Sequence, residues 1–248
     1  MIKDIIHIPN SEKQLRTICS ALIFAIHTRK DVVTTNHLLQ ALWDMYCIPF
    51  SLKSSISNII AFDIDTASVN QQAQNIEDFC KKACPDSNRI IPVVSYLLDE
   101  LMCNIQQHAH SEKGYIFVQH NEDTKTIDIA LADNGITIFG SYVRAQRYLD
   151  LIGNSDAQAL YYAKEGYSTK DLPNAENRGY GLSSNIKMIV EGLQGQFSII
   201  SGNALSIFDN QETIVIELPE DIDWNGTLII ARIPLNIPND FSIYTYII

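Results

Sequence analysis

The sequence predicts an α+β fold: a two-layer α/β sandwich in which helices cover one face of a sheet, with a mostly helical extension in front of it. Two observations predict this fold. Helical patterns dominate the chain as far as residue 193, and four strand-like segments then follow one another to residue 233. A run of strands after a set of helices is typical of a sheet that carries its helices on one face.

The extension is expected to cover residues 1–88, and the turn formers Pro85, Asp86 and Ser87 mark its end. Its first long helix is expected within Ser11–Tyr46, where apolar residues recur at helical spacing: Leu15, Ile18, Cys19, Leu22 and Ile26. A strand is expected at Ile59–Ile64 and a second helix at Val69–Ala83. No motif in the extension indicates a chemical role.

The main domain is expected to cover residues 89–248. Its first helix is predicted at Ile91–His110, followed by strands at Tyr115–His120 and Thr126–Ala132. A helical stretch is expected at Tyr142–Ala163, a polar loop at Gly166–Tyr180 and another helix at Leu182–Leu193. The predicted strands of the tail are Gln196–Ser201, Leu205–Phe208, Thr213–Leu218 and Thr227–Ile233.

The composition narrows the class of protein. A formal net charge of -11 argues against a broad nucleic-acid interface, because phosphate binding needs clustered Lys and Arg. The longest apolar run, Ala21–Ile26, is too short to span a membrane, and no signal-peptide pattern opens the chain. Five scattered cysteines indicate reduced thiols in a cytoplasmic protein. We interpret Cys80 and Cys84, four residues apart, as core residues and not as metal ligands, since no other ligand group flanks them.

The first motif lies in the predicted helix at Ile91–His110. Glu100, Asn104 and His108 are spaced i, i+4, i+8, so they form one polar stripe on a helix that is otherwise largely apolar. A buried stripe of this kind needs polar partners, which a cavity with water, metal and phosphate would supply. The alternative is a stripe that faces solvent on an amphipathic helix.

The second motif is Asp133-Asn134-Gly135, which ends an apolar strand. An Asp at a buried strand end can accept a hydrogen bond from an amine such as adenine N6, and Gly135 can take the positive φ of a tight turn. The alternative is an ordinary turn between a strand and a loop.

The third motif is the glycine-containing loop before the helix at Leu182–Leu193. Gly179 and Gly181 flank the helix start, where backbone N–H groups and the helix dipole favour an anion. Lys170 and Arg178 are candidate partners for phosphate. The alternative is a flexible surface loop.

Together and in this order, the motifs resemble the GHKL superfamily, whose members include gyrase B subunits, MutL proteins, sensor histidine kinases and anti-sigma serine kinases. The family pattern is E-x-x-x-N on a helix, then D-x-G-x-G after a strand, then G-x-G at a helix start. This chain carries Glu100/Asn104, Asp133/Gly135 and Gly179/Gly181 in that order. The histidine at position 108 resembles the pattern of the histidine-kinase and anti-sigma branch. The segment Asn225-Gly226-Thr227 resembles the Gly-Thr at the end of the family pattern. The resemblance covers about 145 residues, from roughly 90 to 235.

The resemblance implies the Bergerat ATP-binding fold, with ATP and Mg²⁺ as cofactors. It implies that Asn104 coordinates the Mg²⁺ and that Asp133 accepts from adenine N6. Thr227 would support the contact between Asp133 and adenine. Gly179 and Gly181 would give a mobile lid its turns, and His108, Gly135, Lys170 and Arg178 complete the expected nucleotide-binding set. Glu100 would be the catalytic base, or, in the alternative, would pair with Lys170 or Arg178 and hold the lid shut.

The sequence departs from the family pattern at one position. Thr137 stands where D-x-G-x-G has its second glycine. Because a β-branched residue tolerates positive φ poorly, the backbone is expected to differ there.

The expected function is that of a cytoplasmic signalling ATPase or protein kinase of the histidine-kinase-like type. No histidine has the setting of a phosphoacceptor helix, and no room remains for a transducer domain. The expected partners are ATP or ADP and a protein, for which a STAS-like domain is one candidate; a homodimer remains open, and neither nucleic acid nor membrane is expected. The alternative function is a non-catalytic interaction module gated by nucleotide.

Overall fold

The computed structural model describes residues 54–56, 60–85, 89–111, 113–122, 124–169, 180–211, 213–218 and 224–246. The helix expected at Ser11–Tyr46 lies outside these residues. So do Lys170, Arg178 and Gly179.

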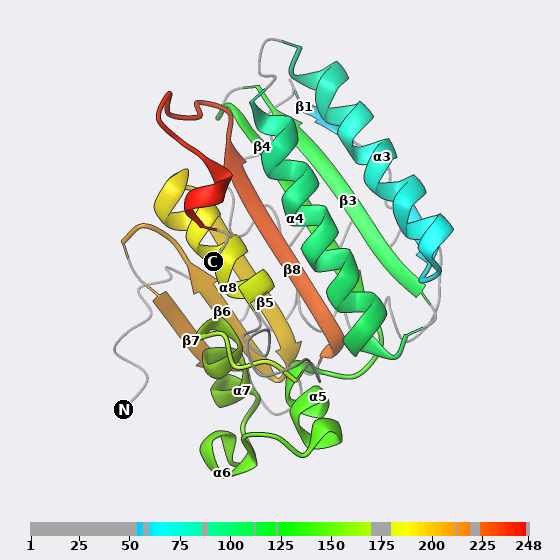
Figure 1. Ribbon diagram of the computed structural model, residues 1–248, viewed down its shortest axis with the longest axis vertical. Helices are drawn as coiled ribbons and strands as arrows, with labels where there is room; N and C mark the ends of the chain where they lie inside the picture. The colour runs from blue at the N-terminus through cyan, green and yellow to red at the C-terminus, as the bar shows by residue number, and fades with distance from the viewer. Residues whose placement is uncertain are drawn as a thin grey trace.

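The described chain is a mixture of helices with one antiparallel sheet (Figure 1). The strands are β1 (Ser54–Ile56), β2 (Ile60–Asp63), β3 (Lys113–Asn121), β4 (Thr126–Asp133), β5 (Gln196–Gly202), β6 (Ala204–Phe208), β7 (Thr213–Glu217) and β8 (Trp224–Pro234). The helices are α3 (Thr66–Ala83), α4 (Ile90–Asn104), α5 (Ile138–Ala145), α6 (Leu149–Ile152), α7 (Asp156–Lys164) and α8 (Tyr180–Lys187). Two π-helical turns, η1 (Ile105–Ala109) and η2 (Met188–Gly192), continue α4 and α8, and a 3-10 turn, η3 (Ile243–Thr245), lies near the end of the chain.

The strand order is β1-β3-β4-β8-β5-β6-β7, and β2 also pairs with β3. All the pairs are antiparallel. The last strand of the chain, β8, therefore lies in the middle of the sheet, between β4 and β5. This order brings the end of β4 beside the beginning of β8, with Ala132 opposite Leu228.

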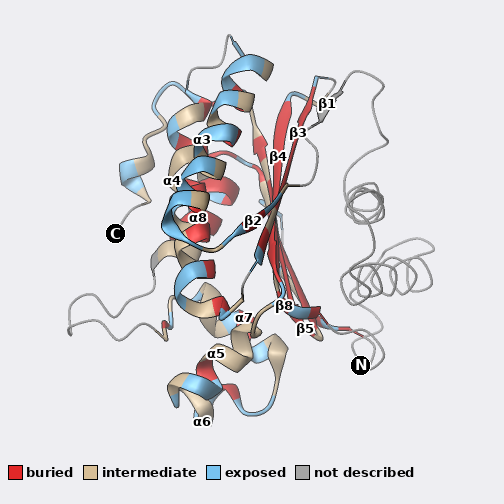
Figure 2. Ribbon diagram, turned by 90° about the vertical axis from the view of Figure 1, so that its right-hand side faces the viewer, coloured by how far each residue is buried: buried red, intermediate tan, exposed pale blue. Residues whose placement is uncertain are grey.

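Helices α3, α4 and α8 lie on one side of the sheet (Figure 2). Alternate residues of the strands face them, since side chains alternate across a strand. Ile127, Ile129 and Leu131 of β4 belong to the same buried cluster as Leu97 and Leu101 of α4. The helix α4 has seven buried residues, so it is the central helix of this core.

The described part of residues 1–88 shares this core with the main domain. Phe62 of β2 and Val69, Ile76 and Cys80 of α3 are buried in the same cluster as α4. The Asp65 carboxylate caps α3 by accepting from the backbone N–H groups of Ala67 and Ser68. One hydrophobic cluster thus contains residues from both sides of the boundary expected at residue 88.

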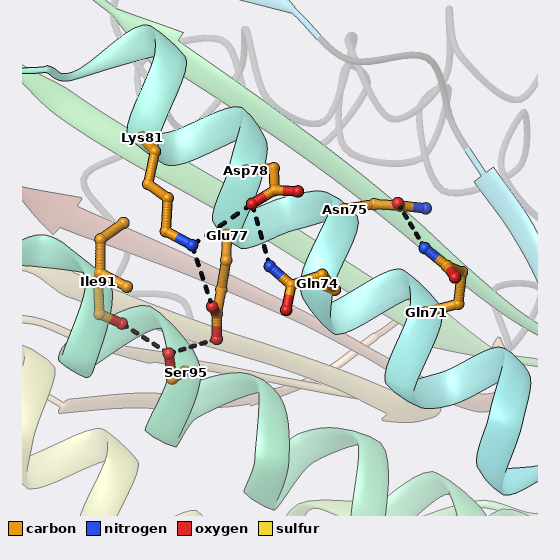
Figure 3. A network of polar contacts seen from close by, with 8 residues as sticks. All are labelled: Gln71, Gln74, Asn75, Glu77, Asp78, Lys81, Ile91 and Ser95. Atoms are coloured by element: carbon orange, nitrogen blue, oxygen red, sulfur yellow. Dashed lines mark hydrogen bonds and ion pairs between the residues drawn. The ribbon is translucent and has the colours of Figure 1, made fainter.

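Polar contacts join α3 to α4 along their outer surface (Figure 3). The Ser95 hydroxyl on α4 bonds both Glu77 of α3, at 2.5 Å, and the Ile91 carbonyl. Lys81 lies 3.7 Å from Glu77 and 3.4 Å from Asp78, within α3 itself. The Lys81 pairs lie largely in solvent and contribute little stability. Buried apolar side chains of both helices pack in one cluster and hold the two helices together.

The helical stretch expected at Tyr142–Ala163 consists of three helices: α5, α6 and α7. The division occurs where the backbone turns left-handed, at Gln146 (φ 53°), Tyr148 (φ 57°) and Gly153 (φ 63°). After the last of these breaks, the Ser155 hydroxyl caps α7 by accepting from the Gln158 N–H. The stretch is therefore helical as expected, but it is not one continuous helix.

Hydrogen bonds from Arg89 hold the segment after β8 against the start of α4. The Arg89 guanidinium donates to the carbonyls of Ile237, Asn239 and Phe241, at 3.1–3.3 Å. Phe241 and Tyr246 stack on each other and lie against Gly192 of η2. Within the described ranges, no helix is both long and apolar enough to cross a membrane.

Candidate functional site

A cavity lies between the end of α4, the turn after β4, the helices α5 and α7 and the beginning of α8. Its floor is made by apolar side chains of α4 and of the two central strands, Leu101, Leu131 and Ile229 among them. The polar lining residues are Asn104, His108, Asp133, Ser141, Tyr142, Tyr167, Ser168, Thr169 and Thr227. Asn104, His108, Asp133 and Thr227, singled out from the sequence, are thus brought together at one cavity, together with Gly181.

Asn104 is the last residue of α4, and His108 lies in the π-helical turn that continues it. Residues four apart lie on nearly the same side of a helix, and both of these side chains line the cavity. His108 Nδ1 lies 3.2 Å from the Thr169 hydroxyl on the opposite wall. His108 therefore links η1 to the segment that follows α7.

Asp133 ends β4 and is 3% exposed. One of its carboxylate oxygens, Oδ1, accepts a hydrogen bond of 2.9 Å from the Gly135 N–H. Burial raises the Asp133 pKa from 3.8 to about 7, while bonds from the backbone N–H groups of Gly135 and Thr227 act in the opposite direction. The cavity thus contains a carboxyl group that gains or loses its proton near neutral pH.

Gly135 is required because the turn after β4 approaches the Ala109 carbonyl closely. It is not required for the positive φ that the sequence suggested. Its φ is not in the positive range. A Cβ atom on Gly135 would overlap the Ala109 carbonyl oxygen, which accepts from the Ile136 N–H at 2.7 Å. Gly135 therefore lets the turn after β4 lie directly against the end of η1.

Gly226 allows β8 to approach Asp133. Its φ is +102°, and a Cβ atom there would overlap the carbonyl and the carboxylate of Asp133. The next residue, Thr227, lines the cavity. Its hydroxyl lies 3.4 Å from the Ser201 hydroxyl, which donates to the Gly226 carbonyl and accepts from the Ile138 N–H. Ser201, which the sequence analysis did not single out, thus connects β5, β8 and the start of α5 beneath the cavity.

Glu100 is not one of the cavity-lining residues. Its carboxylate lies against Gly181 at the start of α8, where a Cβ atom would overlap Glu100 Oε2. Since Gly181 does line the cavity, Glu100 is adjacent to it, behind the first turn of α8. Asn185, fully buried, donates from Nδ2 to the Gly181 carbonyl at 2.9 Å and holds that turn in place.

Thr137 has an extended backbone, with φ -70° and ψ 167°. Its hydroxyl caps α5 by accepting from the Gly140 N–H at 2.9 Å. The backbone therefore needs no positive φ at this position, and a threonine fits it without strain.

A group of tyrosines forms the wall that sequence analysis missed. Tyr142 and Tyr167 line the cavity, and the Tyr142 hydroxyl donates to the Tyr167 carbonyl. Tyr148 and Tyr162 each meet Tyr167 edge to face, at centroid distances of 5.0 and 5.1 Å. The sequence does show that tyrosines cluster in this segment, because five of the 11 tyrosines fall between residues 142 and 167.

The described lining contains no Lys or Arg, and Asp133 is its one acidic residue. The cations suggested for phosphate, Lys170 and Arg178, lie outside the described residues, as does Gly179. Nor does any group of three His, Cys, Asp or Glu residues suited to a metal occur within the described ranges. The described part of the cavity is therefore a mostly apolar slot whose lining includes one carboxyl group, Asp133, and one side-chain amide, Asn104.

No protein-family model and no curated protein matches this chain.

Proposed function

We propose that this chain binds ATP with Mg²⁺ in this cavity, as a signalling ATPase or protein kinase of the histidine-kinase-like type. The observation that carries the proposal is that the buried Asp133 carboxyl lines one cavity together with Asn104, Gly181 and Thr227, which come from three other elements. The motifs that contain these residues are the ones that resemble the GHKL superfamily. The arrangement of helices over one antiparallel sheet supports the finer proposal that the fold is a Bergerat sandwich.

The base of the nucleotide would lie in the apolar slot. Asp133 would accept from the adenine 6-amino group, and Thr227, whose backbone N–H bonds Asp133, would fix the carboxyl group there. Leu131 and Ile229 would contact the ring faces from the sheet. Small-molecule sites are commonly apolar with a few polar groups that fix orientation, and this lining has that composition.

The phosphates would extend toward Asn104 and the first turn of α8. Mg²⁺ in nucleotide sites commonly takes only one or two protein oxygens besides the phosphates, so the absence of an acidic cluster among the described residues suits it. Asn104 would supply such an oxygen. The backbone N–H groups at the start of α8 favour an anion. Bound Mg²⁺ would offset phosphate charge and favour transfer of the terminal phosphoryl group.

The test is isothermal titration with Mg²⁺ and a non-hydrolysable ATP analogue, for wild type, Asp133→Ala and the control Asp150→Ala. Asp150 is an exposed carboxylate on α6, so its removal matches the charge change away from the cavity. Loss of the buried contact should weaken binding by roughly tenfold or more in Asp133→Ala alone. The corresponding inosine triphosphate analogue lacks the 6-amino group. It should bind wild type and Asp133→Ala with the same, weak affinity. Equal ATP affinity of all three proteins would refute the proposal.

A second function, a nucleotide-gated interaction module without turnover, is favoured by one observation. Glu100 contacts Gly181 and is not among the residues that line the cavity. In that module, nucleotide would bind at the same site, and the bound state would present a surface to a protein partner. Turnover separates the two functions: the module binds ATP but releases no phosphate.

A further inference from the structure

The sheet face that points away from α3, α4 and α8 is buried as well. In β4 the alternate residues Asp128, Ala130 and Ala132 face this side, and all eight residues of the strand are buried. The same holds across the sheet, where Leu228 of β8 is 0% exposed and Leu205 of β6 is 1% exposed. Figure 2 shows the described helices on the opposite side. The described helices therefore do not cover this face.

A polar row crosses the same face. Gln119, Asp128, Arg232 and Gln196 are in register on β3, β4, β8 and β5. Asp128 is 0% exposed, and the Arg232 guanidinium bonds both of its carboxylate oxygens, at 2.9 and 3.2 Å. Gln119 is 1% exposed, and its Oε1 has no hydrogen-bond partner among the described residues. Burial of such groups is costly unless the covering layer offers them polar partners.

We propose that residues 1–53 dock on this face and form an internal layer of the domain. They are the one segment outside the described ranges with the length to cover several strands; the next longest is 170–179. The segment also ends at the correct place, because Ser54 begins β1, which pairs with β3 in this sheet.

The chemistry of the segment fits the face. Leu15, Ile18, Cys19, Leu22 and Ile26 recur at helical spacing and would form an apolar stripe that needs a surface to cover. The sheet face offers the apolar side chains of Phe117, Ala130, Leu205 and Leu228. A strand such as β4, buried on both faces, is typical of a sheet with a layer on each side.

The experiment keeps the full chain and inserts a protease site between Lys53 and Ser54. After cleavage, size-exclusion chromatography with mass spectrometry should find residues 1–53 still bound to residues 54–248, in a species of monomer size. Release of a folded 54–248 piece that stays monomeric would overturn the proposal. Release followed by dimerisation would overturn it too, since a second copy would then be the occupant.

A matched pair of variants distinguishes docking from general stability. Leu228→Ala truncates a leucine on the proposed docking face, and Leu131→Ala truncates a buried leucine on the helix face of the same sheet. Leu228→Ala should raise the dissociation constant of the cleaved segment by about tenfold or more, and Leu131→Ala should leave it unchanged. Circular dichroism would verify that both variants are folded. Equal effects of the two substitutions, or none from either, would contradict docking on this face.

Discussion

Asp133 is a carboxyl group in a place that disfavours its ionised form. Burial raises its pKa from 3.8 to about 7, so below about pH 4 it is protonated in both the folded and the unfolded chain. Between about pH 4 and pH 7 the unfolded chain loses this proton and the folded chain keeps it, and stability therefore falls as the pH rises. Above about pH 7 the penalty is constant, on the order of a few kcal/mol.

Asp133→Asn should remove this pH dependence, because an amide of the same shape does not ionise. The free energy of unfolding of the variant, relative to wild type, should rise by a few kcal/mol between pH 4 and pH 8. Urea unfolding at a series of pH values measures it. Parallel pH profiles for the two proteins would mean that Asp133 is not buried in this way.

Glu100→Gln tests the proposed base and retains the side-chain shape beside Gly181. If wild type turns ATP over, the variant should lose about 10²–10⁴-fold in rate while its nucleotide affinity stays nearly constant. Glu165→Gln, on an exposed residue beyond α7, is the control. A joint loss of affinity and rate would assign Glu100 to holding the start of α8 instead. Binding without turnover in wild type would favour the nucleotide-gated module.

At the scale of elements, the helix α5 depends on the residue that departs from the family pattern. Thr137→Ala should lower the free energy of unfolding by about 0.5–2 kcal/mol, because the first turn of α5 loses its cap. Thr137→Gly, which restores the family residue, should cost less than Thr137→Ala but should not stabilise the protein. Chemical denaturation measures both, with Thr213→Ala on the exposed start of β7 as the control. A stabilised glycine variant would show that the threonine strains this turn.

Segments with strong periodicity could be predicted from the sequence. The helix expected at Ile91–His110 corresponds to α4 with η1, and the strands of the tail are each found within a few residues of their expected bounds. The breaks after α5 could not be predicted, because Gln146 and Tyr148 take a left-handed conformation that neither residue type favours. Tertiary packing, and not local sequence, selects it.

The candidate site divides in the same way. Asn104, Asp133 and Thr227 could be named from the sequence because each lies in a motif of fixed spacing. The density of tyrosines is visible in the sequence, but their place at the cavity is not, since Tyr142 and Tyr167 are 25 residues apart and meet only through the folding of α5, α6 and α7. Glu100 and Asn104 share a polar stripe, yet only Asn104 lines the cavity, whereas the Glu100 carboxylate lies against Gly181 at the start of α8.

For the whole molecule, the shared core implies that α3 unfolds together with the sheet. Cys80 of α3 is fully buried, and burial raises its pKa to about 12, with smaller contributions from Cys84 and Glu77. Its alkylation should therefore occur only on global unfolding. The free energy from its labelling rate, followed by mass spectrometry, should equal that from denaturant unfolding. Half-buried Cys103 should react faster and serves as the reference. Rapid Cys80 labelling in the native protein would mean that α3 opens separately.

The π turn at Ile105–Ala109 has a consequence for how this chain could change length over evolution. An α-helix becomes π-helical locally when one extra residue is accommodated, so η1 is a point where the chain could gain or lose a single residue without shifting α4 before it. Everything from Leu97 to Asn104 would keep its packing. The orientation of His108 would change by about a quarter of a turn, which would detach it from Thr169. The gain or loss of one residue in η1 would therefore decide whether the His108 imidazole lines the cavity or not.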